Sequence, residues 1–238
     1  MPTPTALELL WGTGQRPKRG PKPALSLERI VGEAIAIADA EGLANLSMQR
    51  LAERLGFTKM SLYRYVPGKA ELVALMLDTA LGTPPELRTA TDLPEDGWRD
   101  LLGAWCETIY ERFCAHPWSL EATVGMRPIG PNELAWMEAA LGALAGTGLT
   151  TAERLDTIVL LTGHARGLAQ QVRTMDADEF EKQIAGQFAE MVAAAADRYP
   201  ASAAAFAEEG AVAGGAGALK FGIGRILDGL AVLIARRR

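Results

Sequence analysis

Hydrogen-bond donors are concentrated in one short stretch of this chain, GFTKMSLYRYVPGKAEL, which runs from Gly56 to Leu72. Six of its side chains, all within eleven residues, can donate a hydrogen bond, and no acidic residue lies among them. They are Lys59, Ser61, Tyr63, Arg64, Tyr65 and Lys69. Donors of these types bind phosphate groups and the edges of bases. The stretch therefore predicts an anionic partner, whose kind depends on the elements that position the donors.

Two short helices are expected to hold these donors. Ser47 can cap the first helix, whose apolar stripe ends at Gly56. Thr58 can cap the second, very short helix, which turns Leu62 inward and reaches about Tyr65 before a proline-glycine pair. Two short helices joined by a glycine turn are typical of a helix-turn-helix, whose second helix enters the major groove of DNA. The outward side chains of that helix would then meet DNA.

A longer helix is expected on each side of this motif. Ser26 can cap the preceding helix, in which apolar residues recur at spacings of three and four before Gly42. The following helix runs from about Lys69 to Leu81, and its start is a place where free backbone N–H groups also attract a phosphate. Together these elements predict a three-helix DNA-binding domain of the helix-turn-helix type over residues 26–81.

Charge is distributed unevenly along the chain. The whole chain has a net charge of −5, yet residues 16–69 carry ten Lys and Arg against five Asp and Glu, whereas residues 81–238 carry fourteen against twenty-one. The basic part suits a polyanion and the acidic part does not. Residues 1–25 hold five prolines and a basic cluster, which predicts a flexible basic N-terminal arm. The cluster is Arg16, Lys18, Arg19 and Lys22. A solvated tail and a minor-groove contact are equally open roles for that arm.

Residues 82–238 are expected to form a larger helical domain, so that the whole fold is all-α. Alanine and leucine dominate and aromatic residues make up only 6%, which favours helices packed on helices. After a proline-rich connection at 82–97, helices are predicted at 98–115, 133–145, 151–174, 178–199 and 219–235, with a shorter one ending near 125 and a glycine-rich loop at 211–217. The longest begins with a capping box formed by Thr150 and Glu153.

Two segments of the N-terminal part, IVGEAIAIADAEGL and LSMQRLAERLGFTKMSLYRYVPGKAELVALML, form one connected pattern over about residues 24–80. This pattern resembles the DNA-binding domain of TetR-family transcriptional repressors. Two later segments, GPNELAWMEAAL and FGIGRILDGL, are more weakly similar to parts of that family's ligand-binding domain. The resemblance implies a regulator that binds double-stranded operator DNA through the helix-turn-helix and a small-molecule effector through the C-terminal domain.

The resemblance implies roles for particular positions. The start of the short helix would contact bases and phosphates, Tyr63 would hold a phosphate, and the start of the preceding helix would add groove contacts. With the outward Arg64, the expected DNA-contacting residues are Ser47, Gln49, Thr58, Lys59, Met60, Ser61, Tyr63, Arg64, Tyr65 and Lys69. Core packing is the alternative for Tyr63 and Tyr65. Pro67 departs from the family pattern, where lysine or another polar residue is common, and this removes one expected phosphate contact.

Aromatic and apolar residues of the C-terminal domain are candidates for the lining of an effector pocket. They are Trp105, Ile109, Phe113, Met126, Trp136, Met137, Leu160, His164 and Phe180. Apolar side chains at helical spacing lie more often in a core than in a pocket, so core packing is the alternative for each of them. His164 lies in a long apolar helix that would bury it, and a buried imidazole must be hydrogen-bonded.

The helices expected at 151–174 and 219–235 are too apolar for an isolated chain. The first carries small residues that allow a close approach, and the second carries six large aliphatic residues. Burial within the chain is one explanation. The resemblance implies the other, a homodimer in which both helices form a four-helix bundle with their mates. The two explanations are compatible, because each helix has more than one apolar face.

Several other functions are disfavoured by the sequence. No catalytic set of acid, base and nucleophile is found, and Cys106, Cys114 and His116 do not have the spacing of a metal site, so neither an enzyme nor a cofactor is expected. No apolar run approaches the length of a membrane span, and a cytoplasmic protein is expected. We expect a homodimeric repressor that a small, largely apolar ligand releases from a palindromic operator. A regulator without effector response and a ligand-dependent activator are the alternatives.

Overall fold

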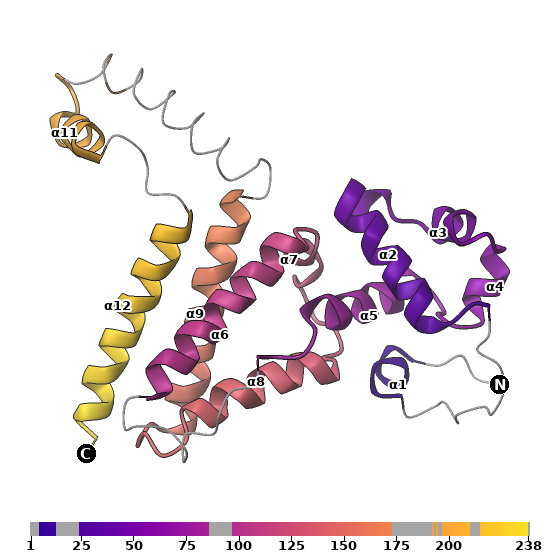
Figure 1. The fold of residues 1–238 in the computed structure, drawn as a ribbon, viewed down its shortest axis with the longest axis horizontal. Coiled ribbons are helices and arrows are strands. Elements are labelled where there is room, and N and C mark those ends of the chain that lie inside the picture. The colour runs from indigo at the N-terminus through magenta and orange to yellow at the C-terminus, as the bar shows by residue number, and fades with distance from the viewer. Residues whose placement is uncertain are drawn as a thin grey trace. The chain divides into compact units, whose positions relative to one another are not determined.

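The computed structural model of the chain describes residues 5–12, 24–85, 97–172, 192, 194, 197–209 and 215–237. The regular structure of these residues is helical throughout, which confirms the predicted all-α fold (Figure 1). The chain divides into two compact units, Met1–Gly146 and Thr147–Arg238. The domain boundary predicted at residue 81 lies inside the first unit and stays a prediction.

The first unit contains the elements of the predicted helix-turn-helix domain. They are α2 (Leu27–Glu41), the 3₁₀ helix η1 (Leu43–Asn45), α3 (Met48–Leu55), α4 (Lys59–Tyr63) and α5 (Lys69–Leu81). Each of the three predicted caps is present, because the hydroxyls of Ser26, Ser47 and Thr58 accept the backbone N–H three residues further on, at 3.2, 3.2 and 3.3 Å. Gly56 ends α3 in the left-handed conformation, with φ of 74°, which a side chain would disfavour.

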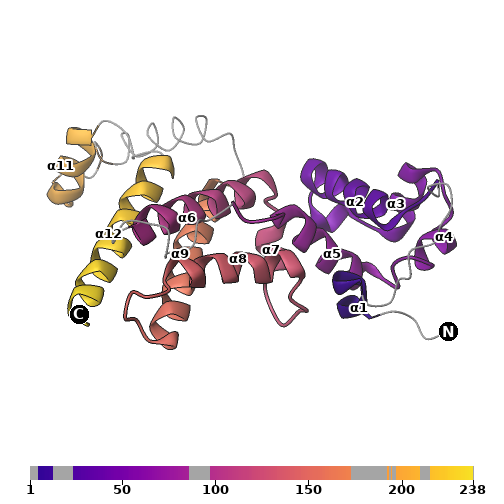
Figure 2. The same ribbon diagram turned by 60° about the horizontal axis from the view of Figure 1, so that its bottom comes forward.

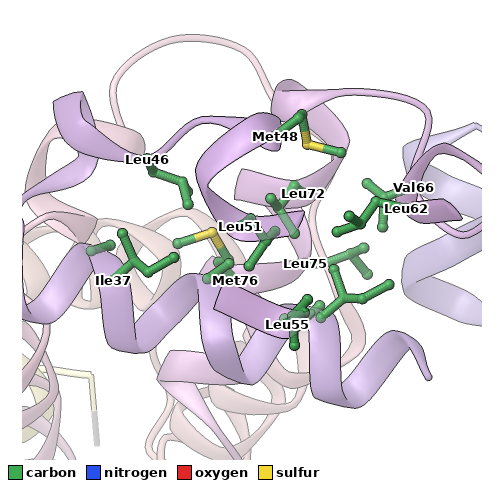
Figure 3. Packing of buried hydrophobic residues seen from close by; sticks show 14 of the residues in the cluster. Ile37, Leu46, Met48, Leu51, Leu55, Leu62, Val66, Leu72, Leu75 and Met76 are labelled. Atoms are coloured by element: carbon green, nitrogen blue, oxygen red, sulfur yellow. The ribbon is translucent and has the colours of Figure 1, made fainter. Parts of the chain in front are cut away.

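Helices α2 to α5 close a single hydrophobic core (Figure 3). Each helix contributes side chains with no exposed surface, namely Ile30, Ile37, Leu51, Leu62, Leu72 and Met76. Full burial of one such side chain stabilises a fold by about 1.5–3 kcal/mol, so this core accounts for the stability of four helices that are each too short to form alone. The core also includes Val66, which follows α4 and anchors its C-terminal end.

A short helix, α1 (Ala6–Trp11), lies within the segment predicted as a flexible arm, and the prediction is wrong there. Thr5 and Glu8 form a capping box at its start, and Leu9 is buried. A six-residue helix is not stable by itself, and α1 is held by its packing against α5 (Figure 2). The local sequence does not reveal that contact. The basic cluster of the arm lies outside the described residues.

The rest of the first unit consists of α6 (Gly97–Ala115), α7 (Ser119–Ala122) and α8 (Pro131–Ala143). The turn between α6 and α7 is joined to α2, because one oxygen of Asp39, Oδ1, accepts the indole N–H of Trp118 at 2.7 Å and lies 2.8 Å from Nδ1 of His116. His116 therefore ends α6 and also contacts the helix-turn-helix core. Helix α8 begins two residues before the predicted start, since Pro131 occupies its first turn, where proline needs no hydrogen-bond partner.

The second unit contains α9 (Thr151–Val172), α11 (Pro200–Glu209) and α12 (Gly215–Ala235). Helices α9 and α12 lie side by side (Figures 1 and 2). The ring of His164 rests on the backbone of Gly222, where a Cβ would lie only 2.1 Å from its Nε2. The predicted capping box of α9 is present. The Thr150 hydroxyl accepts the backbone N–H of Glu153 at 3.2 Å, and one Glu153 carboxylate oxygen accepts both the backbone N–H and the hydroxyl of Thr150, at 2.8 and 2.9 Å.

Two differences from the predicted elements fall in this unit, and one predicted helix is not tested there. Helix α12 begins at Gly215, inside the segment predicted as a loop, because glycine lowers helix propensity without preventing a helix that packs on α9. Helix α11 was not predicted. Most of the predicted helix 178–199 and the last two residues of the predicted helix 151–174 lie outside the described residues.

Candidate DNA-binding surface

The short helix α4 is held in place by its first and last turns. The Thr58 hydroxyl accepts the backbone N–H of Ser61 and lies 2.9 Å from the Ser61 hydroxyl, so both small side chains are engaged at the start of the helix. The backbone N–H groups of Tyr65 and Val66 both donate to the carbonyl of Leu62, at 2.8 and 2.9 Å. The chain turns there, and α4 ends two residues before the predicted end.

The outer face of α4 presents large side chains to solvent. Met60 is 73% exposed and Tyr63 is 36% exposed, although both are large side chains that contain apolar surface. The ammonium group of Lys59 lies 5.7 Å from the centre of the Tyr63 ring, within the range of a cation–π contact. That contact limits the freedom of Lys59 without using its three N–H donors in a hydrogen bond. The helix therefore exposes donors together with apolar surface, as a helix that reads base edges requires.

Two residues at the start of α3 extend this exposed surface. The Ser47 hydroxyl caps the helix by accepting a backbone N–H, and as a hydroxyl it keeps its own proton for a further partner. The Gln49 amide donates to a Glu53 carboxylate oxygen at 2.7 Å. A shallow groove lies between these side chains; its lining is Ser47, Gln49, Arg50, Glu53 and Arg54.

Part of the positive charge on this surface is neutralised within the chain. Arg50 pairs with Glu41, and Arg54 pairs with Glu33 at 2.8 Å. Both acidic partners lie on α2, and neither pairing follows from the local sequence. Arg64 is exposed and forms no ion pair with a described residue, so its guanidinium group remains available to a phosphate.

Tyr65 and Lys69 each donate a hydrogen bond to a backbone carbonyl of the helix-turn-helix domain. The Tyr65 hydroxyl donates to the carbonyl of Leu25 at 2.9 Å, and the side chain is half-buried against the core. This favours the packing role, which was the alternative for Tyr65. The Lys69 ammonium donates to the carbonyl of Leu43 at 3.1 Å, yet the side chain is exposed and retains two further donors. A phosphate contact therefore remains compatible with Lys69.

Arg29 is a basic residue of this region that the sequence did not single out. Its guanidinium group donates to the carbonyl of Ala24 and lies 6.0 Å from the centre of the Phe57 ring, immediately before the cap of α4. The available signal was its position in the first turn of α2, where the helix dipole favours acidic residues. Because the helix dipole does not favour a cation there, Arg29 is expected to serve another purpose. Arg29 lies close to the start of α4, which makes it a candidate phosphate contact.

The pocket candidates of the first unit differ in burial, from fully buried to fully exposed. Trp105 and Trp136 are buried, with their ring centres 5.9 Å apart. The Trp105 indole N–H donates to the carbonyl of Trp136 at 2.9 Å, and the Trp136 indole N–H donates to the carbonyl of Gly82 at 2.8 Å. Ile109 is also buried. Met126, in contrast, is fully exposed in the loop before α8, because the loop carries it away from the helices. Phe113 and Met137, on α6 and α8, are half-buried.

The two described pocket candidates of the second unit, Leu160 and His164, differ in their exposure and in their contacts. Leu160 is 56% exposed on α9, so most of its side chain is not packed in a core of the described residues. The Nε2 atom of His164 lies 3.2 Å from the carbonyl of Leu219, which gives this half-buried imidazole the hydrogen bond that its surroundings require. His164 thus joins α9 to α12. Phe180 lies outside the described residues.

The described thiols and carboxylates form no reactive or metal-binding set. Burial raises the pKa of the Cys106 thiol to about 12, which keeps it protonated and unreactive at neutral pH. Over the described part of the chain, no group of three His, Cys, Asp or Glu residues could hold a metal ion. Within the same residues, no helix is long and apolar enough to span a bilayer.

A capped short helix with exposed donors, mounted on a helix-turn-helix core, defines a DNA-binding protein. The family comparison agrees with this class. Residues 30–76 match the family model described as bacterial regulatory proteins of the tetR family, and residues 90–234 match the tetracyclin repressor-like C-terminal domain. The chain belongs to the TetR family of transcriptional regulators, which are DNA-binding proteins and not enzymes.

Individual relatives support the same assignment. The chain is 42% identical to the HTH-type transcriptional repressor DrrR1 of Streptomyces coeruleorubidus, over 98% of this chain and 87% of that protein. It is 31% identical to an HTH-type transcriptional regulator of Saccharopolyspora erythraea, over 79% and 78%. The TetR-family protein ActR of Streptomyces coelicolor, in complex with actinorhodin, shares the fold with a TM-score of 0.74 at 26% identity, covering 88% of this chain and 98% of ActR.

Proposed function

We propose that this protein is a homodimeric repressor that binds a near-palindromic operator by placing α4 of each chain in a major groove. The observation that carries the proposal is the outer face of α4, where Lys59, Met60 and Tyr63 are exposed while Leu62 is fully buried. Two-fold docking requires the half-sites to lie about one turn apart, ~34–36 Å, or a multiple of that distance.

Base reading and phosphate binding fall on different residues. Lys59, Met60 and Ser61 lie at the start of α4, from which a side chain reaches base edges. The side chains expected to bind phosphates are Tyr63, Arg64 and Lys69, with Arg29 as an addition that the structure suggests. Thr58 is expected to contact a base or a phosphate, and Ser47 and Gln49 are expected to add groove contacts. Phosphate contacts fix the register of the protein on DNA and carry no sequence information by themselves.

A homodimer through α9 and α12 is supported by the side chains that these helices leave exposed. Val159 and Leu160 are 70% and 56% exposed on α9, and Phe221 and Val232 are 71% and 53% exposed on α12. Apolar surface of this kind, gathered on two adjacent helices, is typical of an interface that another chain covers. A four-helix bundle with the second chain would remove it from water.

We further propose that a small, largely apolar effector weakens operator binding. Support comes from ActR, whose solved structure contains actinorhodin. An effector shifts the equilibrium between DNA-competent and incompetent states only as far as it binds one of them better. Actinorhodin is therefore a reasonable first probe.

The decisive experiment is selection of bound duplexes from a random pool at near-physiological salt, followed by operator titration with and without actinorhodin. A palindromic consensus supports the dimeric repressor. No enrichment by a folded, dimeric protein would contradict it. An operator affinity that neither actinorhodin nor a panel of apolar ligands changes would favour the regulator without effector response, and operator binding only with ligand would favour the activator.

A further inference from the structure

The C-terminal end of α5 is bonded to the start of α8 through one carboxylate. The Oδ1 atom of Asp78 accepts the backbone N–H groups of Asn132 and Glu133, at 3.0 and 3.1 Å. These groups belong to the first turn of α8 and have no partner within that helix. In return, the Asn132 amide donates to the backbone carbonyl of Asp78 at 2.9 Å. A residue of the helix-turn-helix core thus supplies the cap of a helix that begins more than fifty residues later.

The chain before α8 is shaped to receive this carboxylate. Gly130 is the N-cap of α8 and offers no side-chain cap of its own. A Cβ at that position would lie 2.1 Å from Oδ1 of Asp78 and 2.3 Å from its Cγ, so a larger residue would expel the carboxylate. The loop is also folded back on α8, since Arg127 forms two bonds of 2.7 Å to the carboxylate of Glu133.

Helix α1 contacts the same place from a third direction. It packs against α5, and the indole N–H of Trp11 donates to the carbonyl of Ile129 at 3.2 Å, next to Gly130. A further bond lies just beyond α5, where the Trp136 indole of α8 donates to the carbonyl of Gly82. Elements that are far apart in the sequence therefore meet at the end of α5 that is remote from α4.

We propose that Asp78, Gly130 and Trp11 form a joint that fixes α5, and with it the reading helix α4, relative to α8 of the same chain. This inference rests on the proposed function, because a fixed orientation matters only when two heads must fit two half-sites at a defined separation. The joint touches no residue of the DNA-binding surface. Its role is to make the protein selective for half-site spacing, while affinity for a single half-site depends on the residues of the DNA-binding surface.

The test compares three duplexes: the selected operator, the operator with 2 base pairs inserted between its half-sites, and a duplex with one half-site scrambled. The ratio of affinities for the first two measures spacing selectivity. Asp78→Ala removes the cap, whose loss is expected to lower this ratio at least about fivefold. Affinity for the duplex with one half-site should change less than about twofold. Trp11→Phe, which removes only the indole donor, should lower the ratio in the same direction to a smaller extent.

Asp78→Asn is the matched control. Both N–H groups of α8 donate to a single oxygen of Asp78, and an asparagine retains one such oxygen, so this variant should keep the wild-type ratio. An Asp78→Ala ratio equal to that of the wild type overturns the joint. An equal loss on all three duplexes also overturns it, because that pattern reports damage to the reading head.

The joint and the proposed function fail in different ways. A wild-type protein that does not distinguish the operator from the scrambled duplex overturns the proposed function and, with it, any role for the joint. If Asp78→Ala does not fold, as circular dichroism would show, Trp11→Phe decides alone, and an unchanged ratio in that folded variant overturns the proposal.

Discussion

The two groups of helices, α2 to α5 and α9 with α12, differ in how many large apolar side chains they leave exposed. In the first group, the large hydrophobic side chains that remain exposed are Met60 and Tyr63, both on the helix that we assign to DNA. In the second group, Leu155, Val159, Leu160, Phe221 and Val232 remain exposed, although each helix also buries a second stripe. The helix-turn-helix buries its large aliphatic residues in a core within the first unit, whereas α9 and α12 leave apolar surface exposed, which we propose a second chain covers. Exposed apolar residues thus have a different meaning in the two regions.

The largest expected effect is on the free energy of unfolding, when one leucine-to-alanine substitution is made in the helix-turn-helix core and the same substitution is made on α9. Leu62→Ala removes a fully buried side chain from the helix-turn-helix core and should lower the free energy of unfolding by about 2–5 kcal/mol. Leu160→Ala removes a side chain that is more than half exposed and should change it far less in dilute, monomeric protein. Chemical denaturation of both variants measures the difference. Similar losses would mean that Leu160 belongs to a core.

A charge on the exposed face of α9 should prevent dimerisation. Val159→Asp places a carboxylate in the proposed interface of both chains, and the lost burial of two valines alone corresponds to about 3 kcal/mol. The control is Val124→Asp, because Val124 is 73% exposed, close to the 70% of Val159, but lies in the first unit. Light scattering after gel filtration should show a monomer for Val159→Asp and a dimer for the control. A dimer in both variants would place the interface elsewhere.

Lys59 and Arg64, two exposed basic residues of the DNA-binding surface, should differ in their effects on sequence preference and on salt dependence. Lys59→Ala should relax the preference at one base pair by about 1–3 kcal/mol, since Lys59 lies where base edges are read. Arg64→Ala should weaken binding to all sequences alike and reduce the salt dependence by about one phosphate contact. Titration of operator, point-substituted operator and random duplex over a range of salt separates the two. Equal loss on operator and random DNA for Lys59→Ala would contradict its assignment as a base reader.

The smallest effect concerns pH. Burial raises the pKa of Asp78 above its ordinary value, although the N–H groups of Glu133 and Asn132 act in the opposite direction. The folded protein therefore binds this proton more tightly than the unfolded chain. That contribution to stability is present below about pH 4 and is lost as pH rises through the raised pKa. The stability of the wild type relative to Asp78→Asn should thus fall over this window, as denaturation at several pH values would show. A difference that rises with pH would indicate a lowered pKa.

The helix-turn-helix could be predicted because its signals are local. Ser26, Ser47 and Thr58 each cap the helix that follows within three residues, and Gly56 ends α3 in a conformation that glycine favours. The apolar spacing then places one face of each helix in the core. These preferences act within one or two turns, so they can be read along the chain without knowledge of the fold.

The candidate residues for an effector pocket do not have local signals of this kind. Trp105, Trp136, Met126 and Leu160 are all apolar and all lie at plausible helical positions, yet the first two pack on each other and the last two face solvent. Whether an apolar side chain lines a core, a pocket or an interface depends on what packs opposite it. That partner comes from another part of the chain or from another chain.

The sequence by itself determined the class of fold, the caps and turns of α2 to α5, and the outward donors of α4. Only the tertiary structure decided that Tyr65 bonds to Leu25, that Arg54 pairs with Glu33, and that Asp78 caps α8. The physical reason is the distance along the chain. Caps, turns and helical faces depend on neighbours within a few residues, whereas these bonds join residues 21 to 54 positions apart. They form only where tertiary packing brings these distant segments together.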